Sequence, residues 1–188
     1  MANHIFLKIY PTSKTGDYFK GNSKAADHPQ EIEVDSWSHS FEQPISAATP
    51  SSEVGPTSRC NHEPLTFSKF FDNASDDLMK ACWIGECLDA VFTLYRPLGA
   101  SGKNQAVESN RYLAIHVKHA YLKSMSISGE ADEVAKEELS LVYNYIQYQF
   151  TKVDLKLGKL DPSDRPKIDW YWAENLVGTG DDIPKPSM

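Results

Sequence analysis

The most regular pattern in the chain lies in residues 31–43, where apolar and polar side chains alternate and so predict a β-strand with unlike faces. The apolar positions change parity near Asp35. They are Ile32, Val34, Trp37, His39 and Phe41. A β-bulge or a sharp twist at Asp35 would return all of them to one face.

The other side of this strand carries small hydroxyl groups. Ser36, Ser38 and Ser40 occupy alternate positions, so they share the face opposite Trp37. A face of this kind is polar and without bulk. It suits contact with solvent and binds little by itself.

Similar alternation predicts further strands, and residues 111–127 fit either one extended strand or two with a kink. Residues 134–154 are ambiguous because their start favours helix, but the aromatic alternation from Glu138 onward favours strand. Residues 11–29 predict a mobile surface connection. The remaining predicted strands are residues 4–10, 61–69, 88–95 and 167–176, the last with Trp170 and Trp172 on one face.

One helix is predicted after Asp72. Ser75 is a suitable N-cap, acidic residues follow it in the first turn, and Gly85 ends the segment. Apolar residues recur at helical spacing, which predicts one narrow buried face that includes Cys82.

Residues 44–59 form a long, turn-rich excursion between two predicted strands. Connections longer than about 12 residues in a compact domain are usually functional or disordered. The composition fits a projecting contact arm and a floppy surface loop equally. If it is a contact arm, its candidate contact residues are Pro44, Ile45, Ser46, Pro50, Ser51, Ser52, Gly55 and Pro56.

These elements predict a mainly β protein, a small β-barrel or sandwich of two sheets with one flanking α-helix. A chain of 188 residues with 40% hydrophobic residues fits a single domain with one core. It has more two-faced strands than one such barrel needs, which indicates that copies of the chain cover some outer faces. Trp37, Phe41 and Trp170 are therefore expected in the core or at a subunit interface.

Charge and targeting signals narrow the partners. The net charge of −7 disfavours nucleic acid and anionic membrane surfaces. Neither a cleavable signal peptide nor an apolar stretch long enough to insert in a membrane is evident. Three cysteines without paired spacing fit reduced thiols in a cytoplasm, although export of the folded protein remains compatible with all of these features.

Candidate chemistry is sparse, and we predict no catalytic residue, no metal site and no cofactor. Cys60 and His62 would point the same way in a strand, but two ligands fall short of a structural zinc set. His116 and His119 are three apart in a strand, so they are expected on opposite faces. A glycosidase with paired carboxylates stays open, although nothing points to one.

The chain resembles the haemolysin-coregulated protein (Hcp) family, the inner-tube subunits of the bacterial type VI secretion system. The resemblance rests on five segments taken in order. They are IFLKI at 5–9, EIEVDSWS at 31–38, LTFSK at 65–69, DDLMKAC at 76–82 and WYWAEN at 170–175.

The resemblance implies a structural protein in which six copies close into a ring and rings stack into a tube. Implied partners are the contractile sheath, the spike protein and effector cargo. The implied location is the cytoplasm before firing, followed by secretion. Residues 1–176 would form the domain, with residues 44–59 as its contact arm, and residues 177–188 would form a C-terminal tail.

Under this resemblance Ser36, Ser38 and Ser40 are expected to face the lumen, and the arm is expected to join stacked rings. Two rival classes remain on sequence alone. A lipocalin-like ligand-binding barrel would be a monomer with a closed apolar cavity, and a Cys/His enzyme would depend on Cys60. A hexamer of six 21.1 kDa chains would favour the tube subunit.

Overall fold

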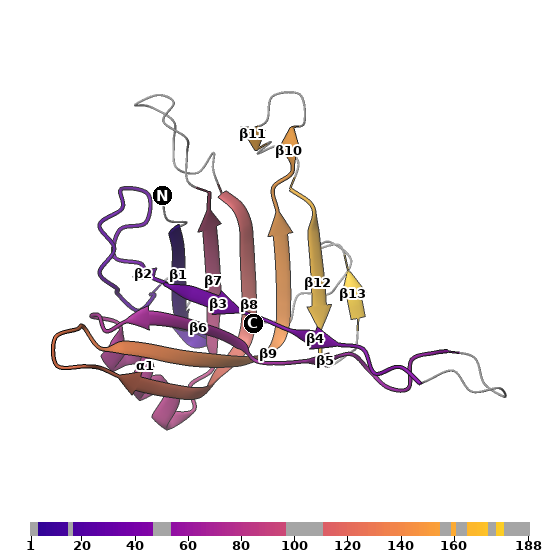
Figure 1. Cartoon of the computed structure of the whole chain (residues 1–188), viewed down its shortest axis with the longest axis horizontal. Helices are drawn as coiled ribbons and strands as arrows, with labels where there is room; N and C mark the ends of the chain where they lie inside the picture. The colour runs from indigo at the N-terminus through magenta and orange to yellow at the C-terminus, as the bar shows by residue number, and fades with distance from the viewer. Residues whose placement is uncertain are drawn as a thin grey trace.

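A computed structural model gives the fold, in which nine of the described strands form one antiparallel sheet that folds over on itself (Figure 1). The order along its main path is β13, β12, β9, β8, β7, β1 and β2. The structure describes residues 4–14, 17–46, 54–96, 111–154, 159–160, 165–172 and 176–178.

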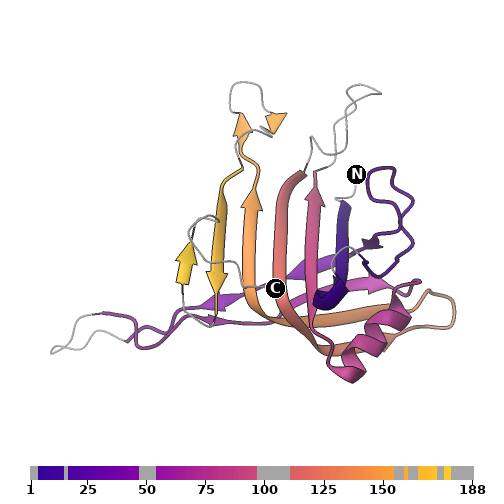
Figure 2. The same ribbon diagram turned by 180° about the vertical axis from the view of Figure 1, so that it is seen from behind.

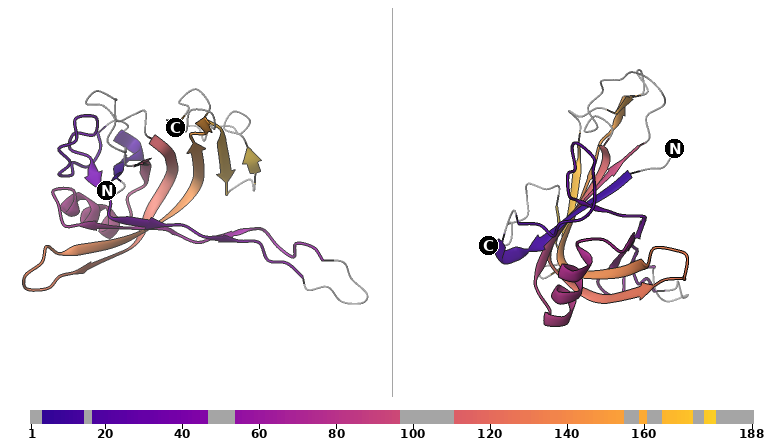
Figure 3. Two further views of the ribbon diagram at one scale, coloured as in Figure 1. Left: turned by 45° about the horizontal axis from the view of Figure 1, so that its top comes forward. Right: turned by 90° about the vertical axis from the view of Figure 1, so that its left-hand side faces the viewer.

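Two long strands, β8 (Arg111–Ser128) and β9 (Lys136–Phe150), belong to both layers of the fold. Their upper halves pair with β7 and β12, and their lower halves continue below the bend, where β9 pairs with β6 (Figures 1 and 3). The upper layer contains β1 (His4–Pro11), β2 (Ile32–Glu33), β7 (Leu88–Tyr95), β12 (Lys167–Tyr171) and β13 (Leu176–Gly178). The lower layer adds β6 (Leu65–Phe70) and β3 (Ser36–Ser38).

Two short hairpins and one 3-10 turn complete the described elements. The first hairpin pairs β4 (Phe41–Glu42) with β5 (Asn61–His62), and the second pairs β10 (Val153–Asp154) with β11 (Lys159–Leu160). The turn η1 spans Thr12–Lys14.

The expected two-layer, mainly β architecture with one helix is confirmed, but the sheet is not a closed barrel. Within the described residues its path ends at β13 on one side and at β2 on the other. A lipocalin-like barrel with a closed cavity does not fit this open order.

The core fills the angle between the two layers. Phe67 of the lower layer meets Phe92 of the upper layer edge-on, with ring centroids 5.4 Å apart, and both side chains are fully buried. Leu7 and Ile115 add to the core from the upper layer, and Leu139 adds to it from the lower one. The core is therefore shared, and neither layer would bury its apolar face alone.

The helix α1 (Ser75–Ile84) flanks this core and packs against β8. Its Leu78 and Ala81 are buried, whereas Cys82, expected on the buried face, is only half-buried. Gly85 ends the helix with φ 64°, a left-handed conformation that glycine adopts without strain. The predicted N-cap was wrong. Ser75 is the first helical residue, and its hydroxyl instead accepts a hydrogen bond from the backbone N–H of Asp72.

The segment predicted as one strand over residues 31–43 passes from the upper to the lower layer near Asp35, where a bulge or sharp twist was predicted. The N–H of Val34 donates a hydrogen bond to the carbonyl of Ile5 in β1 at 2.9 Å. The N–H of the next residue, Asp35, donates to the carbonyl of Ser68 in β6 at 2.8 Å. The parity change near Asp35 thus marks the crossing from the upper to the lower layer. Because of it, the segment is divided into β2, β3 and β4 rather than continuous.

Two other predictions about segments were wrong. Residues 167–176 are not one strand, because the chain reverses and Leu176 pairs with Tyr171. The connection before β2 is packed rather than loose: within it His28 and Glu31 are buried and hydrogen-bonded to each other.

One glycine explains how closely this connection lies against β2. A Cβ at Gly21 would stand 2.5 Å from the carbonyl oxygen of Glu31, a distance that no side chain can occupy. The backbone bond from Gly21 to the carbonyl of Gln30, at 2.8 Å, needs that close approach.

A buried ion pair joins β6, β9 and the start of α1. The Lys69 ammonium lies 2.7 Å from both Glu137 and Asp72, and Lys69 and Glu137 are fully buried. Lys69 also donates to the hydroxyl of Ser75 at 3.0 Å. A buried charge is tolerated only when it is paired in this way, so each partner depends on the other.

We predict that Lys69→Met destabilises the chain by about 3–5 kcal/mol, because it leaves the Glu137 carboxylate buried and unpaired. Urea unfolding followed by tryptophan fluorescence measures this loss. The matched control is Lys136→Met, which breaks an exposed pair with Asp35 and should cost less than about 1 kcal/mol. Equal losses in the two variants would contradict the role given to the buried pair.

Candidate functional site: the hydroxyl face and the projecting arm

Two adjacent rows of polar side chains, most of them small, lie on the outer side of the lower layer. We name these two rows the hydroxyl face. Its first row runs across β3, β6, β9 and β8, and its second row lies next to it. The first row is Ser38, Thr66, Ser140 and Ser124, and the second is Ser36, Ser68, Glu138 and Ser126. Sequence reasoning found only the contribution of β3.

The hydroxyl groups of this face pair across the strands. Ser36 and Ser68 are hydrogen-bonded at 2.8 Å, Ser38 and Thr66 at 2.6 Å, and Ser124 and Ser140 at 2.6 Å. Since alternate residues of a strand point to opposite sides, the intervening Trp37, Phe67 and Leu139 pack toward the core. The outer side of these strands is therefore polar, and their inner side is apolar.

Ser40 lies just beyond this pairing. It is exposed, as Ser36 and Ser38 are, and its carbonyl accepts the N–H of Glu63 at 2.9 Å. The three serines are thus all exposed, although the assignment to a lumen remains a proposal.

The segment predicted as either an arm or a loop is a projecting β-ribbon where the structure describes it. We name residues 41–62 the arm. Its base is the pairing of Phe41 with His62, and further out Ile45 bridges Pro56. It extends well beyond the body of the molecule (Figures 1 and 2). Among the proposed ring-contact residues, Pro50, Ser51 and Ser52 lie outside the described residues.

Side chains also hold the two halves of the arm together. Gln43 donates to the carbonyl of Ser58 at 2.7 Å, and the N–H of Ser46 donates to the carbonyl of Gly55 at 2.9 Å. These cross-links give the arm a defined shape with no core of its own.

The arm exposes large apolar side chains. Phe41 is 63% exposed, Ile45 60% and Val54 63%. Phe41 is therefore not a core residue of the single chain, and only the interface alternative remains for it. Trp37 and Trp170 are half-buried and pack against the core.

A hydrogen-bonded chain of rings joins the arm base to the body. Tyr148 contacts Nδ1 of His39, Nε2 of His39 contacts the hydroxyl of Tyr143 at 2.6 Å, and that hydroxyl contacts Nδ1 of His62 at 2.9 Å. The ring of His62 also stacks on Trp170, with centroids 4.9 Å apart. The sequence predictions missed this cluster because its members come from β5, β9, β12 and the segment after β3.

Burial controls the protonation of this cluster. It lowers the pKa of His39 to about 4, with a further contribution from nearby His62, and it also lowers the pKa of His62. Burial raises the pKa of Tyr148 to about 12. The cluster is therefore neutral at pH 7, and its rings pack without charge.

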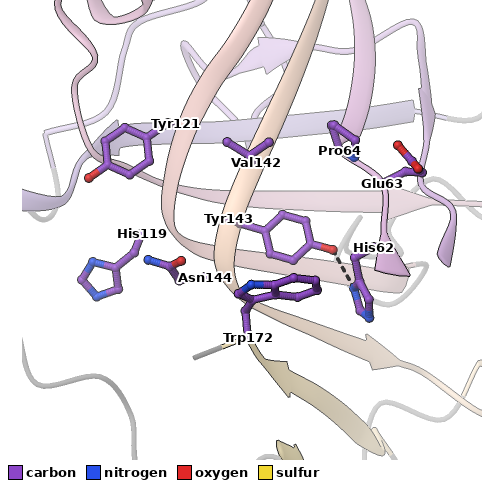
Figure 4. A pocket seen from close by; sticks show the side chains of 9 residues that line it. All are labelled: His62, Glu63, Pro64, His119, Tyr121, Val142, Tyr143, Asn144 and Trp172. Atoms are coloured by element: carbon purple, nitrogen blue, oxygen red, sulfur yellow. Dashed lines mark hydrogen bonds between the residues drawn. The ribbon is translucent and has the colours of Figure 1, made fainter. Parts of the chain in front are cut away.

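Two hollows flank the arm base. One, of about 240 Å³, is lined by His62, His119, Tyr121, Tyr143 and Trp172 among others (Figure 4). The other, of about 360 Å³, lies between Phe41, Ile168 and Val177. In Figure 4 Pro64, Val142 and Tyr121 form a row that continues the hydroxyl face toward the first hollow with larger side chains.

Cys60 and His62, the pair weighed from the sequence as a possible metal or nucleophile site, contact different groups. His62 is directed to Tyr143 and Trp170, while the thiol of Cys60 contacts the carbonyl of Asn61. Across the described ranges no group of three or more His, Cys, Asp or Glu side chains could hold a metal ion.

The expectation that His116 and His119 lie on opposite faces assumed unbroken alternation along the strand. The structure contradicts this assumption. His119 has φ 48° and lies where the pairing of β7 with β8 changes register. It approaches Cys87, a contact that strand spacing could not predict.

The molecule described so far is a two-layered open β-sheet with a polar outer face and a projecting apolar arm, the properties of an assembly subunit. Residues 6–150 match the family described as type VI secretion system effector, Hcp. Hcp1 of Pseudomonas aeruginosa is 32% identical over 176 residues, which cover 94% of this chain and 99% of that protein. The chain belongs to the Hcp family and is a tube subunit of the type VI secretion system.

Solved structures agree on the fold. Hcp1 from Salmonella typhimurium has a TM-score of 0.67 at 22% identity, covering 95% of this chain and 100% of that one. A structure described as a type six secretion system protein has a TM-score of 0.77 at 16% identity, covering 94% and 100%. Hcp proteins form hexameric rings and are secreted components of this system.

We predict that stability falls as the pH is lowered from about 6.5 to about 4. In this range the unfolded chain binds a proton at His39 that the folded chain excludes, so protonation favours unfolding. The loss should be about 2 kcal/mol, allowing for partial solvent screening. Urea unfolding at several pH values measures it, and His39→Gln should flatten this part of the profile. An unchanged slope in that variant would contradict the assignment.

Proposed function

We propose that the hydroxyl face forms the wall of the tube lumen and that the arm joins one ring to the next. The observation that carries this proposal is the presence of two unlike surfaces: adjacent rows of mostly small polar side chains lie on the outer side of the lower layer, and Phe41, Ile45 and Val54 are exposed on the described part of the arm. A channel wall needs the first kind of surface, and a subunit contact needs the second.

The lumen assignment is supported by size and chemistry. The rows of the hydroxyl face contain no large apolar side chain, so little apolar surface would hold cargo irreversibly. Their hydroxyls and the Glu138 carboxylate can still form hydrogen bonds with a passing protein. The single proposed role for Ser36, Ser38 and Ser40 is to keep this wall low and polar.

The stacking assignment is supported by the geometry of the arm. Ile45 and Val54 lie on opposite strands of the arm and both are exposed. A head-to-tail assembly uses two different patches per subunit, so an apolar ribbon on one copy can meet another surface on the next copy without requiring self-complementarity.

We further propose that the chain is structural rather than catalytic and that it binds no cofactor. Its partners would be five further copies in the ring, the sheath outside the tube, the spike at its tip and effector proteins within it. It would be made in the cytoplasm and leave the cell without a cleavable signal peptide. Membership of a tube-protein family supports each of these statements.

We predict that replacing residues 44–59 with an Asn-Gly turn yields single rings in place of stacked ones. The turn preserves the pairing of Phe41 with His62, so the body should fold normally. Electron microscopy measures stacking, and native mass spectrometry should still detect six chains.

A milder variant separates loss of apolar contact from loss of the whole arm. Ile45→Ser combined with Val54→Ser keeps the arm backbone and removes its exposed apolar groups. It should also reduce stacking. Unaltered tubes from the deletion variant would rule out the arm as the stacking element.

We predict that Ser38→Tyr reduces cargo retention while leaving rings intact. The side chain is exposed, so the substitution should change the stability of the chain by no more than about 0.5 kcal/mol. Co-purification of effector with isolated rings measures retention. Lys80→Tyr, on the exposed side of α1, is the matched control and should retain cargo normally. Loss of ring assembly in Ser38→Tyr would overturn the orientation proposed for this face.

A further inference from the structure

Cys87 lies where the chain enters β7, and polar side chains from η1 and β8 lie close to its sulfur. The hydroxyl oxygen of Thr12 lies 3.5 Å from Sγ, and Nδ1 of His119 lies 3.9 Å from it. The nearby Cys87 raises the pKa of the Tyr121 hydroxyl. The thiol is thus in contact with a basic nitrogen and with the hydroxyl group of Thr12.

A buried carboxylate fixes this arrangement. Oδ1 of Asp89 accepts the backbone N–H of His119 at 2.9 Å and the hydroxyl of Thr12 at 3.1 Å. His119 is held there at φ 48°, which is uncommon for a residue other than glycine. The bulge redirects the histidine, as bulges in sheets often do, and brings its ring to the sulfur.

The cluster lies at the edge of a hollow. His119 and Tyr121 line the hollow of about 240 Å³ beside the arm base (Figure 4). Cys87 itself is half-buried and is not among the lining residues. A compound that enters this hollow would meet the imidazole that contacts the thiol.

The other thiols have different surroundings. Cys60 contacts the carbonyl of Asn61, and Cys82 contacts the carbonyl of Leu122, each at 3.9 Å. Both are half-buried, as Cys87 is. The chain therefore contains matched controls for the effect of an imidazole on thiol reactivity.

We infer that Cys87 is a thiol–disulfide exchange site for small disulfides, with His119 as the base that accepts its proton. The sulfur of Cys87 attacks one sulfur of the incoming disulfide, so that a new S–S bond forms as the old one breaks. The departing sulfur takes the electron pair and then the proton from His119. The products are a mixed disulfide at Cys87 and one free small thiol.

This site does not depend on the proposed lumen or stacking roles. Proteins of this family are secreted, so the chain passes from a reducing compartment to one where small disulfides persist. The exchange would mark that passage with a reversible modification. A reducing environment would remove it again.

The experiment exposes native rings to excess glutathione disulfide at pH 7.5 and follows each thiol by peptide mass spectrometry. Cys87 should react about tenfold faster than Cys60 and Cys82. His119→Asn should slow Cys87 about tenfold and leave the other thiols unchanged, because the amide is not a base at this pH. Asparagine also accepts a positive φ, so the bulge should persist.

His116→Asn, on the same strand, is the matched control and should leave the rate at Cys87 unchanged. Native mass spectrometry of the same samples reports ring assembly, so failure of the exchange site is distinguishable from failure of the tube function. The inference is overturned if Cys60 or Cys82 reacts as fast as Cys87, or if His119→Asn reacts at the wild-type rate.

Discussion

The fold depends on one constraint: β8 and β9 must stay paired while they pass through a bend from one layer to the other. These strands are 18 and 15 residues long, and every other layer element pairs with them directly or through a neighbour. The core lies inside the bend, so the outer side of each layer is left for other uses. The hydroxyl face is the outer side of the lower layer, which is why it extends over four strands rather than the one that first suggested it.

Two buried polar contacts add to the hydrophobic packing. Asp89 holds the backbone of His119 in the bulge of β8, and Lys69 of β6 pairs with Glu137 of β9 on the buried side of the lower layer. Burying such a group without a partner is unfavourable, but each of these groups has one. The first contact fixes the local shape of β8, and the second joins β6 to β9 and to the start of α1.

Local pattern predicted much of this fold, and its failures have identifiable physical causes. The parity change at Asp35 predicted a twist or bulge, and the structure shows a change of sheet partner there. The bulge at His119 carries no such signal, because both neighbouring segments alternate normally and the conformation depends on Asp89 of another strand. The ring cluster of the arm base was likewise invisible, since it forms only when β5, β9 and β12 come together. The sequence alone therefore predicted the shared polar face of Ser36, Ser38 and Ser40. It did not predict the cluster of His39, Tyr143 and His62.

The surfaces assigned to lumen and core are coupled through strand register. Ser36 and Ser38 alternate with Trp37, so a shift of one residue in β3 would place the indole on the hydroxyl face and a serine in the core. Substituting one of the serines should change the stability of the fold little, because the register stays intact. An insertion in β3 would instead exchange the two faces. The exposed side chains of the hydroxyl face can thus be changed one at a time without disturbing the core. The core behind them sets the limit, because Trp37 must remain opposite Phe67 for the lower layer to close on the upper one.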